Sequence, residues 1–455
     1  MRARAILAVA AVAAIVLGAT LLQSVHPKAL GTAAPLGASA GSWFCPHGGG
    51  KGWRGELSLT NPGSDPVTAQ VIDSGASGRT AERTITVPSS SSIRVAVDSS
   101  AMETGTQVEY FDGWVGAAWS SVAGGDQSGI AAEECEPALS RTWIVPDGTT
   151  VRGEGGWIVV MNPTAADAIF GIRLLTEQAV TEPGPWSDVV LRPGRTAAFE
   201  LSTYKLDKRT VSAVVQAKIG RVAVASIGLS AQGGVRAAAG IPAAVHSVTL
   251  PGGPDAGRSE LVVANPGGGK ATYRGMLDRT DGSQPISQLN GESLGSEQAV
   301  TYEVSTDQTS TIQLAVTSQA GIAVARRTFG PQGDTGATVG AIPATAWVIP
   351  AGTTSSNGVW KLSLANPGTV PAQVHLRLLG AKGQAAKPQE VKVPAGRTVL
   401  VGVSLTKPAP EGAVVAVASS GTFVPMATSF TRDVSGYAVS MGEPVPARWI
   451  ASIGQ

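Results

Sequence analysis

The chain repeats a short phrase at a nearly constant interval, and this period limits its possible folds more than any other feature. An Asn-Pro pair closes an apolar stretch four times, at Asn61, Asn162, Asn265 and Asn366. The spacings between successive pairs are 101, 103 and 101 residues. A fixed period over most of a chain indicates tandem units that fold alike. The sequence therefore predicts four consecutive units of about 100 residues each.

Two further markers run in step with the Asn-Pro pair. A Trp-x-x-Pro phrase or its relative precedes each pair, as WFCP, WIVP, VTLP and WVIP. A stretch with alternating apolar residues follows each pair, as ITVPSSSSIRVAV, VVLRPGRTAAFEL, LGSEQAVTYEV and VKVPAGRTVLVGV. A fifth relative of the Trp marker, ARWIASIG around Trp449, ends the chain. Markers in constant order at a constant period strengthen the prediction of tandem repetition.

The Asn-Pro phrase itself predicts the turn of a β-hairpin. In KLSLANPG, residues 361–368, Leu362 and Leu364 point to one face of a strand. The proline keeps Asn366 out of the helical region, because its ring restricts the preceding residue. Pro367 and Gly368 suit the central positions of a type II turn, where glycine supplies a positive φ. Each phrase therefore ends one strand and starts its partner.

Composition agrees with short strands joined by tight turns. The chain holds 57 Gly and 29 Pro, and only 15% of its residues are charged. Units of this length with alternating strands predict an all-β chain of four tandem immunoglobulin-like antiparallel β-sandwich domains. The Cys…Trp…Cys pattern of antibody domains is absent, so only the sandwich architecture is expected. The alternative is a β-propeller with two blades in each unit, since blades span about 40–50 residues.

The first 22 residues form a targeting segment rather than part of this fold. Arg2 and Arg4 precede 18 uncharged residues, 5–22. As a helix these would span about 27 Å, which is close to a bilayer core of about 30 Å. The segment is therefore a retained signal anchor, with a cleaved signal peptide as the alternative. The positive residues before it place the remainder outside the cytoplasm, in a single-pass membrane protein or, after cleavage, a secreted one.

These observations predict six segments along the chain. They are a signal anchor or signal peptide at 1–22, an Ala/Gly/Ser-rich linker at 23–42, and β-sandwiches at 43–141, 142–245, 246–345 and 346–455.

The two cysteines of the chain predict one disulfide. Cys45 lies in the expected first strand of unit one, and Cys135 lies eight residues before Trp143, at the end of that unit. An even cysteine count in an exported chain favours a bond. Unit one lacks a preceding neighbour, so a covalent link there would compensate for missing interface contacts. Reduction is therefore expected to lower the melting temperature of unit one alone.

The sequence carries no recognisable catalytic or metal-binding pattern. It contains four histidines, no H-E-x-x-H, no C-x-x-C and no Asp-rich calcium loop. We therefore predict no catalytic residues, no cofactor and no metal site, and hence no enzyme. The net charge of +1 arises from 34 basic and 33 acidic residues, without the basic face that nucleic-acid binding requires.

Three tryptophans fall outside the repeat period and are candidate binding aromatics. They are Trp114, Trp119 and Trp186. Aromatic faces can stack on sugars or anchor a protein partner. Exposure of these rings is the discriminating observation, because three buried rings would remove the basis for a binding role.

The layout W-x-x-P … NPG … VPAGRTV behind an N-terminal membrane segment resembles an uncharacterised family of actinobacterial exported proteins, known only as a domain of unknown function. The resemblance implies a location in the cell envelope and transfers no functional residue. We expect a non-enzymatic, membrane-tethered scaffold or protein-binding module, held in the membrane through residues 5–22. Its partner would be another envelope protein or wall glycan. The alternative is a cell-wall glycan-binding protein that uses exposed aromatics of the first domain.

Overall fold

The computed structural model describes residues 40–453 except 125–126, 205–206, 231–233, 253–256, 308, 330–334, 351–357, 402–411 and 432–436. Within it, Gly41–Gln455 forms one compact unit. The predicted anchor at 5–22 and nearly all of the linker at 23–42 lie outside the described residues. Among the helices that the structure does describe, none is long and apolar enough to cross a membrane.

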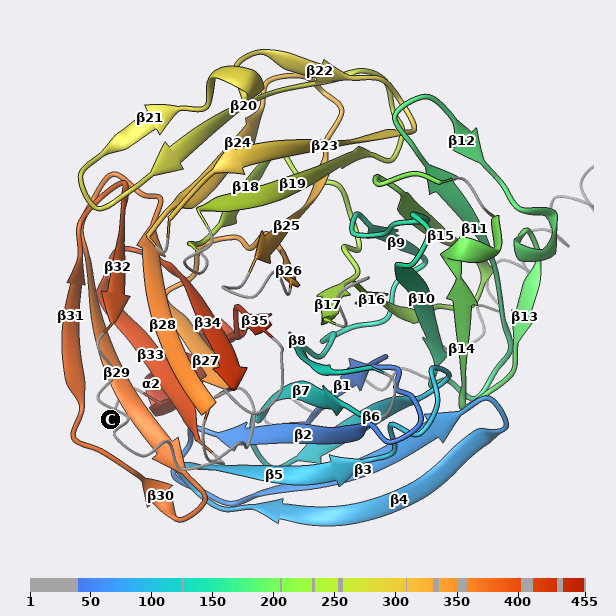
Figure 1. The fold of residues 1–455 in the computed structure, drawn as a ribbon. Coiled ribbons are helices and arrows are strands. Elements are labelled where there is room, and N and C mark those ends of the chain that lie inside the picture. Colours follow the sequence, from blue (N-terminus) through green and yellow to red (C-terminus); the bar gives the residue numbers. More distant parts are fainter. Residues whose placement is uncertain are drawn as a thin grey trace, which may run out of the picture. The chain divides into compact units, whose positions relative to one another are not determined.

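The first repeat, here module 1 (residues 41–134), contains eight strands in two antiparallel sheets (Figure 1). The strands are β1 (Gly41–Cys45), β2 (Arg54–Asn61), β3 (Val67–Gly75), β4 (Gly78–Val87), β5 (Ser91–Val97), β6 (Gly105–Phe111), β7 (Gly116–Ala123) and β8 (Gly129–Glu134). One sheet has the order β1-β6-β3-β4 and the other β5-β2-β7-β8. Each sheet combines strands from distant parts of the module, whereas a propeller blade is built from consecutive strands.

Module 2 (residues 142–239) repeats this arrangement with a divided outer strand. Its elements are β9 (Thr142–Val145), β10 (Gly155–Asn162), β11 (Ala168–Leu175), β12 (Val180–Thr181), η1 (Gly184–Trp186), β13 (Val189–Leu191), β14 (Arg195–Glu200), η2 (Leu201–Tyr204), β15 (Ser212–Ile219), β16 (Ala223–Leu229) and β17 (Val235–Ala239). The sheets are β12-β11-β15-β9, with β13 also on β11, and β14-β10-β16-β17.

Module 3 (residues 247–339) follows the same plan. Its elements are β18 (Ser247–Leu250), β19 (Arg258–Asn265), β20 (Ala271–Asp278), β21 (Ser283–Pro285), η3 (Ser287–Leu289), β22 (Glu292–Leu294), β23 (Gln298–Ser305), β24 (Thr311–Val316), β25 (Ala323–Phe329) and β26 (Thr335–Val339). The sheets are β18-β24-β20-β21, with β22 also on β20, and β23-β19-β25-β26.

Module 4 (residues 346–440) is followed by a short strand and a helix. The elements are β27 (Ala346–Pro350), β28 (Gly358–Asn366), β29 (Ala372–Gly380), β30 (Gly383–Gln384), β31 (Gln389–Val393), β32 (Arg397–Val401), β33 (Ala413–Ser420), β34 (Val424–Thr431), β35 (Tyr437–Ser440), β36 (Glu443–Pro444) and α2 (Ala447–Ile453). The sheets are β30-β29-β33-β27-β36, with β31 also on β29, and β32-β28-β34-β35. The fifth relative of the Trp marker differs from the others in its structure: Trp449 lies in α2 and packs against the core of module 1.

The repeated Asn-Pro phrase is explained by the asparagine side chain. β2 ends at Asn61, whose Nδ2 donates to the Asp65 carbonyl (2.7 Å) and to the Val87 carbonyl (3.2 Å). Its Oδ1 accepts the N–H of Gly63. The same three contacts recur at Asn162, Asn265 and Asn366. In each case Nδ2 donates to the carbonyl four residues later and to a carbonyl of the third marker, and Oδ1 accepts the N–H of the residue two positions later. One buried amide thus ties the hairpin turn to the next marker in every module.

The predicted type II turn is wrong at two of these sites. Gly63 and Gly368 do not adopt a positive φ, whereas Gly267 does, at 142°. In each module the asparagine Oδ1 takes the place of a backbone carbonyl and accepts the N–H two residues on, which is an Asx turn. The side-chain bond, rather than the conformation of the glycine, closes the turn.

Replacing Asn162 with alanine should lower the free energy of unfolding by about 2 kcal/mol. The substitution leaves the buried Leu191 carbonyl without its donor, and an unsatisfied buried group costs about 1–3 kcal/mol. Chemical denaturation of the full chain measures the change. Asp167→Ala, at an exposed position in the same loop, is the matched control and should shift stability by less than about 0.5 kcal/mol. Equal effects of the two variants would contradict this role.

The Trp markers occupy the module cores and use their ring nitrogen. Trp43, Trp143 and Trp347 are buried, and their Nε1 groups donate to the carbonyls of Val115, Val222 and Phe423. Each bond joins the first strand of its module to the residue just before β7, β16 or β34, respectively. Burial of the ring with a satisfied N–H is the usual compromise for tryptophan in a core.

The last strands of the modules contact one another in a cycle. β17 lies against β8 and β26, and β35 lies against β26 and β8 (Figure 1). Two glycines are required by the close approach of these strands. A Cβ on Gly129 would lie 2.6 Å from the Val235 nitrogen, and one on Gly336 would lie 2.6 Å from Val439 Cγ2. Each module of residues 41–455 therefore has two neighbours, because the contact between module 4 and module 1 closes the cycle.

Candidate functional site

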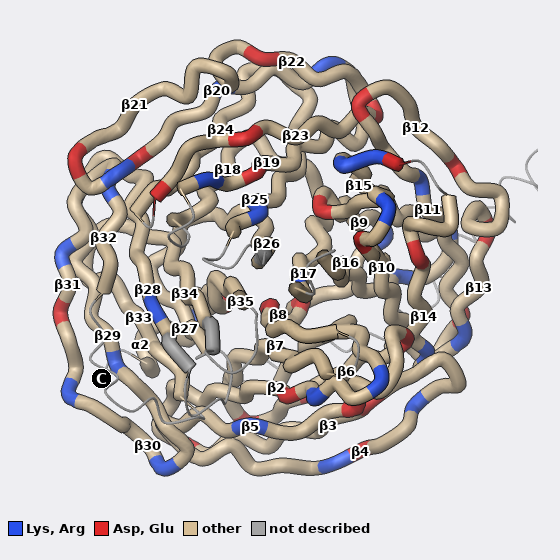
Figure 2. The backbone as a smooth tube through the Cα atoms, in the orientation of Figure 1, with Lys and Arg blue, Asp and Glu red and all other residues tan. Residues whose placement is uncertain are grey.

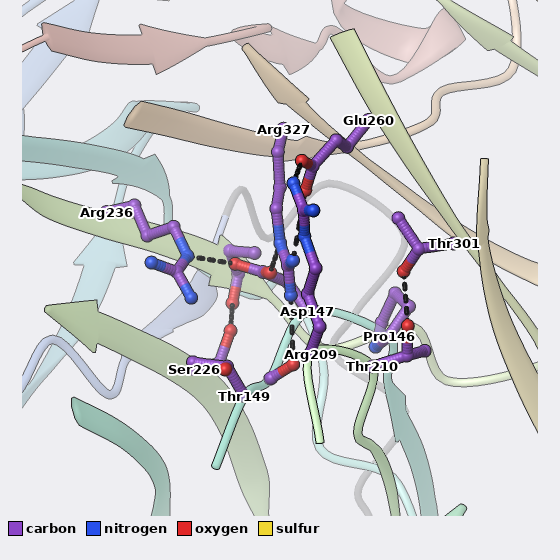
Figure 3. Close-up of polar contacts among 12 residues, drawn as sticks. Pro146, Asp147, Thr149, Arg209, Thr210, Ser226, Arg236, Glu260, Thr301 and Arg327 are labelled. Carbon is purple, nitrogen blue, oxygen red and sulfur yellow. Dashed lines mark hydrogen bonds and ion pairs between the residues drawn. The ribbon is translucent and has the colours of Figure 1, made fainter. Parts of the chain in front are cut away.

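Charged side chains are buried where module 2 meets module 3. Asp147 follows β9 in WIVPDG and is almost fully covered. Its Oδ2 accepts a hydrogen bond from Arg236 Nε (2.9 Å) on β17, and its Oδ1 accepts one from Arg327 Nε on β25 (Figure 3). Arg327 belongs to the next module, so the carboxylate joins the two.

A second carboxylate extends the cluster. Glu260 on β19 is buried and accepts from Arg327 Nη1 (3.3 Å) and from Arg209 Nη2. Arg327 also donates through Nη2 to the Gly148 carbonyl (2.9 Å). We call these five residues the buried ion network: the buried Asp147, Glu260, Arg236 and Arg327, together with Arg209, whose side chain is 60% exposed and reaches Glu260 from the surface. Figure 3 shows Arg327 between the two carboxylates.

The backbone beside the network leaves room for it. Arg236 pairs with Gly228 across the β16–β17 ladder. A Cβ on Gly228 would lie 2.6 Å from Arg236 Cζ. Glycine at this strand position therefore lets the guanidinium pass over β16 and reach Asp147.

The electrostatics of the network keep Asp147 ionised. Burial by itself would raise the pKa of Asp147, but the charges of Arg236 and Arg327 outweigh it and hold the pKa at about 2. Both carboxylate oxygens are occupied by guanidinium groups, so Asp147 is poorly suited to accept a proton from a substrate or to attack one. Chemically, the network can hold two modules together by charge.

Hydrogen-bonded hydroxyl pairs join neighbouring modules at three junctions. Thr210 Oγ1 lies 2.5 Å from Thr301 Oγ1 between modules 2 and 3 (Figure 3). Corresponding pairs join Ser74 to Thr196 (2.8 Å) and Thr311 to Thr398 (2.5 Å). Modules 1 and 2, 2 and 3, and 3 and 4 are thus joined by a buried or partly buried polar contact.

Two consecutive glutamates of β8 connect module 1 to both of its neighbours. Glu133 Oε2 accepts the N–H of Ala239 (3.0 Å) in module 2. Glu134 Oε1 accepts from Ser440 Oγ and from the N–H of Gly442, at the end of module 4. Successive residues of a strand point to opposite faces, which is why adjacent side chains reach different modules.

The carboxyl groups near this junction are strongly perturbed. Burial raises the pKa of Glu133, Glu136 and Glu443 well above the usual range, and the negative charge of Glu134 adds to the effect. Within the described ranges, no three His, Cys, Asp or Glu side chains are grouped so that they could hold a metal ion.

Glu443→Gln should make the protein more stable than the wild type at pH 8. The folded pKa of Glu443 lies above its unfolded value, so the folded state binds more protons, and stability falls as pH rises from about 4.5 through the folded pKa. Glutamine removes this loss. Thermal unfolding from pH 4 to pH 9 measures the loss, with Glu103→Gln, at a carboxyl of module 1, as a control. A variant that is less stable than the wild type at pH 8 would refute the assignment.

The predicted disulfide is confirmed. Cys45 at the end of β1 is bonded to Cys135, just after β8, with a Cα–Cα distance of 4.5 Å. Both residues are buried. The bond joins the first strand of module 1 to the segment that follows its last strand.

The three candidate binding aromatics are buried. Trp114, Trp119 and Trp186 are 4%, 2% and 8% exposed. Trp114 packs edge-on against Trp43, and Trp186 packs against Phe199 and Tyr204. Their faces are therefore not available for stacking on a sugar in this structure, and the glycan-binding alternative loses the observation that motivated it.

Sequence reasoning missed the buried ion network, although two signals were present. β25 contains consecutive arginines, Arg326 and Arg327, in an apolar strand, so one must face each side. The position after the proline of the Trp marker also holds a polar residue twice, His47 and Asp147. His47 is buried and bonded to Thr106 Oγ1 (3.0 Å), and burial lowers its pKa, so the neutral ring packs where Asp147 carries a charge.

Comparison with known proteins identifies a family without naming an activity. One family model matches the chain twice, over residues 100–348 and 300–429. The second match begins 200 residues after the first, which is close to two repeat periods. No curated protein matches the chain. The two matches together cover most of its length, and the chain therefore belongs to DUF5719, a family of unknown function.

Proposed function

We propose that this protein is a non-enzymatic scaffold or protein-binding module of the cell envelope. In this proposal four tandem immunoglobulin-like β-sandwiches are tethered outside the cytoplasm by residues 5–22. The pairing of β2 with β5 and of β3 with β6 supports the immunoglobulin-like assignment, because the corresponding strands pair in that fold.

The observation that carries the proposal is the buried ion network. Burying charges is costly unless each is paired, and an apolar contact would hold two modules equally well. Ion pairs demand one geometry, so they fix the orientation of module 3 against module 2. A scaffold requires such fixed spacing between its binding surfaces, and a set of independent domains does not.

Two features support a location outside the cytoplasm. The buried Cys45–Cys135 bond fits an oxidising compartment, where disulfides form and persist. The apolar N-terminal segment with its preceding arginines fits an anchor whose C-terminal side faces outward. Cleavage of the segment would give a secreted form with the same folded modules.

Site-directed crosslinking in intact cells tests the proposal. Three variants each carry a photoreactive residue at one exposed apolar position: Val190, Ile342 or Val370. We expect at least one position to capture a defined envelope protein, and external protease to cut the chain in intact cells. Capture of wall glycan instead would support the alternative. A chain shielded from protease in intact cells and accessible only after lysis would reject the envelope location.

A further inference from the structure

A cavity of about 500 Å³ lies between module 1 and module 2, and two arginines line it. Arg192 and Arg195 flank the turn that joins β13 to β14, and the N–H of Arg195 donates to the Arg192 carbonyl (3.3 Å). A closed turn of this kind brings its first and fourth Cα atoms within about 7 Å, so the two side chains start side by side. The opposite wall includes Glu103 of module 1.

A third arginine approaches the same turn from module 1. Gly194, between the two arginines, has a φ of 67° and faces Arg79 of β4. A Cβ built on Gly194 would lie 3.1 Å from Arg79 Cγ and 3.7 Å from its Nε. Figure 2 shows Lys or Arg on both β4 and β14. In the part of the chain that the structure describes, no ion pair involves Arg79, Arg192 or Arg195.

The matching turn at the next junction carries a carboxylate, whereas the β13–β14 turn carries none. In module 3 the residue matching Gly194 is Glu297, which also has a positive φ, of 58°. Its Oε1 pairs with Arg173 Nη1 of the preceding module. A side chain at positive φ is disfavoured by about 1–2 kcal/mol, so glutamate is held there against its backbone preference. At both junctions an arginine of the preceding module faces the turn, but only the turn of module 3 carries a negative charge of its own, on Glu297.

We propose that the cavity between modules 1 and 2 binds an oxyanion, that is, a carboxylate or phosphate group of a ligand. The ligand supplies here the negative charge that the carboxylate of Glu297 supplies at the junction between modules 2 and 3. Guanidinium groups bind both oxyanions through paired N–H donors. Three arginines against Glu103 leave two net positive charges around the site. Arg192 and Arg195 contact the anion, and Arg79 completes the positive field.

Calorimetric titration of the full chain with inorganic phosphate and, separately, with glutarate tests the proposal. We expect at least one probe to bind, and the tighter one identifies the preferred oxyanion. Arg192→Gln with Arg195→Gln should weaken binding at least tenfold, whereas Arg152→Gln, an exposed arginine of another loop in module 2, should change it less than twofold. Failure of the wild type to bind either probe, or equal affinity in the double variant, would overturn the site.

A second pair of variants separates charge from volume. Gly194→Glu places a carboxylate at the position of Glu297, with a backbone conformation that Glu297 already shows to be compatible with glutamate. Gly194→Glu should abolish binding of the probe that the wild type binds. Gly194→Gln introduces a side chain of nearly equal size without the charge and should weaken binding less. Equal losses in both variants would mean that the side chain only obstructs the cavity, which contradicts replacement of a charge. Thermal unfolding of each variant confirms that it is folded.

Discussion

Replacing Asp147 with alanine is expected to destabilise the protein by about 3–5 kcal/mol. The substitution removes the only carboxylate that faces both Arg236 and Arg327 within the described network, and it leaves two guanidinium groups buried. Breaking a buried pair from one side is severe because the remaining charge keeps its desolvation cost. Chemical denaturation of the full chain measures the loss.

The matched control is an exposed ion pair of the same module. Lys218 Nζ lies 2.6 Å from Asp188 Oδ1, and both side chains are more than half exposed. Asp188→Ala should cost less than about 1 kcal/mol, because water screens the pair and solvates the lysine that remains. If Asp147→Ala costs no more than Asp188→Ala, the buried ion network does not hold modules 2 and 3 together.

The stabilisation by Asp147 should also depend on pH in one direction. Its folded pKa of about 2 lies below the ordinary value near 3.8, so the folded state holds fewer protons than the unfolded state within that window. Stability from this group is complete above about pH 4 and is lost as pH falls toward 2. In Asp147→Ala the acid limb of the stability curve should therefore be shallower than in the wild type.

The features that sequence reasoning recovered depend on local chemistry. A strand that ends at Asn366, a turn at Pro367 and a partner strand after it all follow from neighbouring residues. Because the phrase recurs with the repeat period, the same local prediction applies to all four units. Even so, the turn type was wrong, because a side chain can replace a backbone carbonyl as the acceptor, and sequence spacing alone does not distinguish the two.

The features that sequence reasoning missed depend on contacts between residues far apart in the chain. Asp147 and Arg327 are separated by 180 residues, and their contact exists only after module 3 packs on module 2. Trp119 and Arg326 occupy matching positions, opposite Leu57 of β2 and Leu261 of β19, so one repeat site holds a ring and another a charge. Burial of Trp114 likewise follows from packing against Trp43, which no periodicity indicates.

Removing the disulfide should lower stability by about 4–5 kcal/mol in the chain-entropy model, the second large effect that we expect. Cys45 and Cys135 are 90 residues apart, so the bond closes a long loop in the unfolded chain. The sequence predicted a loss confined to the first unit. The structure gives a different expectation, because the core of module 1 is continuous with Val348 and Val415 of module 4 and with Ile227 of module 2.

Unfolding of module 1 would therefore expose apolar surface on both of its neighbours, and the loss should be shared. In scanning calorimetry, Cys45→Ala with Cys135→Ala should shift the main transition of residues 41–455 to lower temperature as one event. Reductant should produce the same shift in the wild type and none in the double variant. The unreduced protein should show no free thiol. A split transition in which one quarter of the enthalpy moves alone would show instead that module 1 unfolds independently, and that its shared core contributes little to the cycle of contacts.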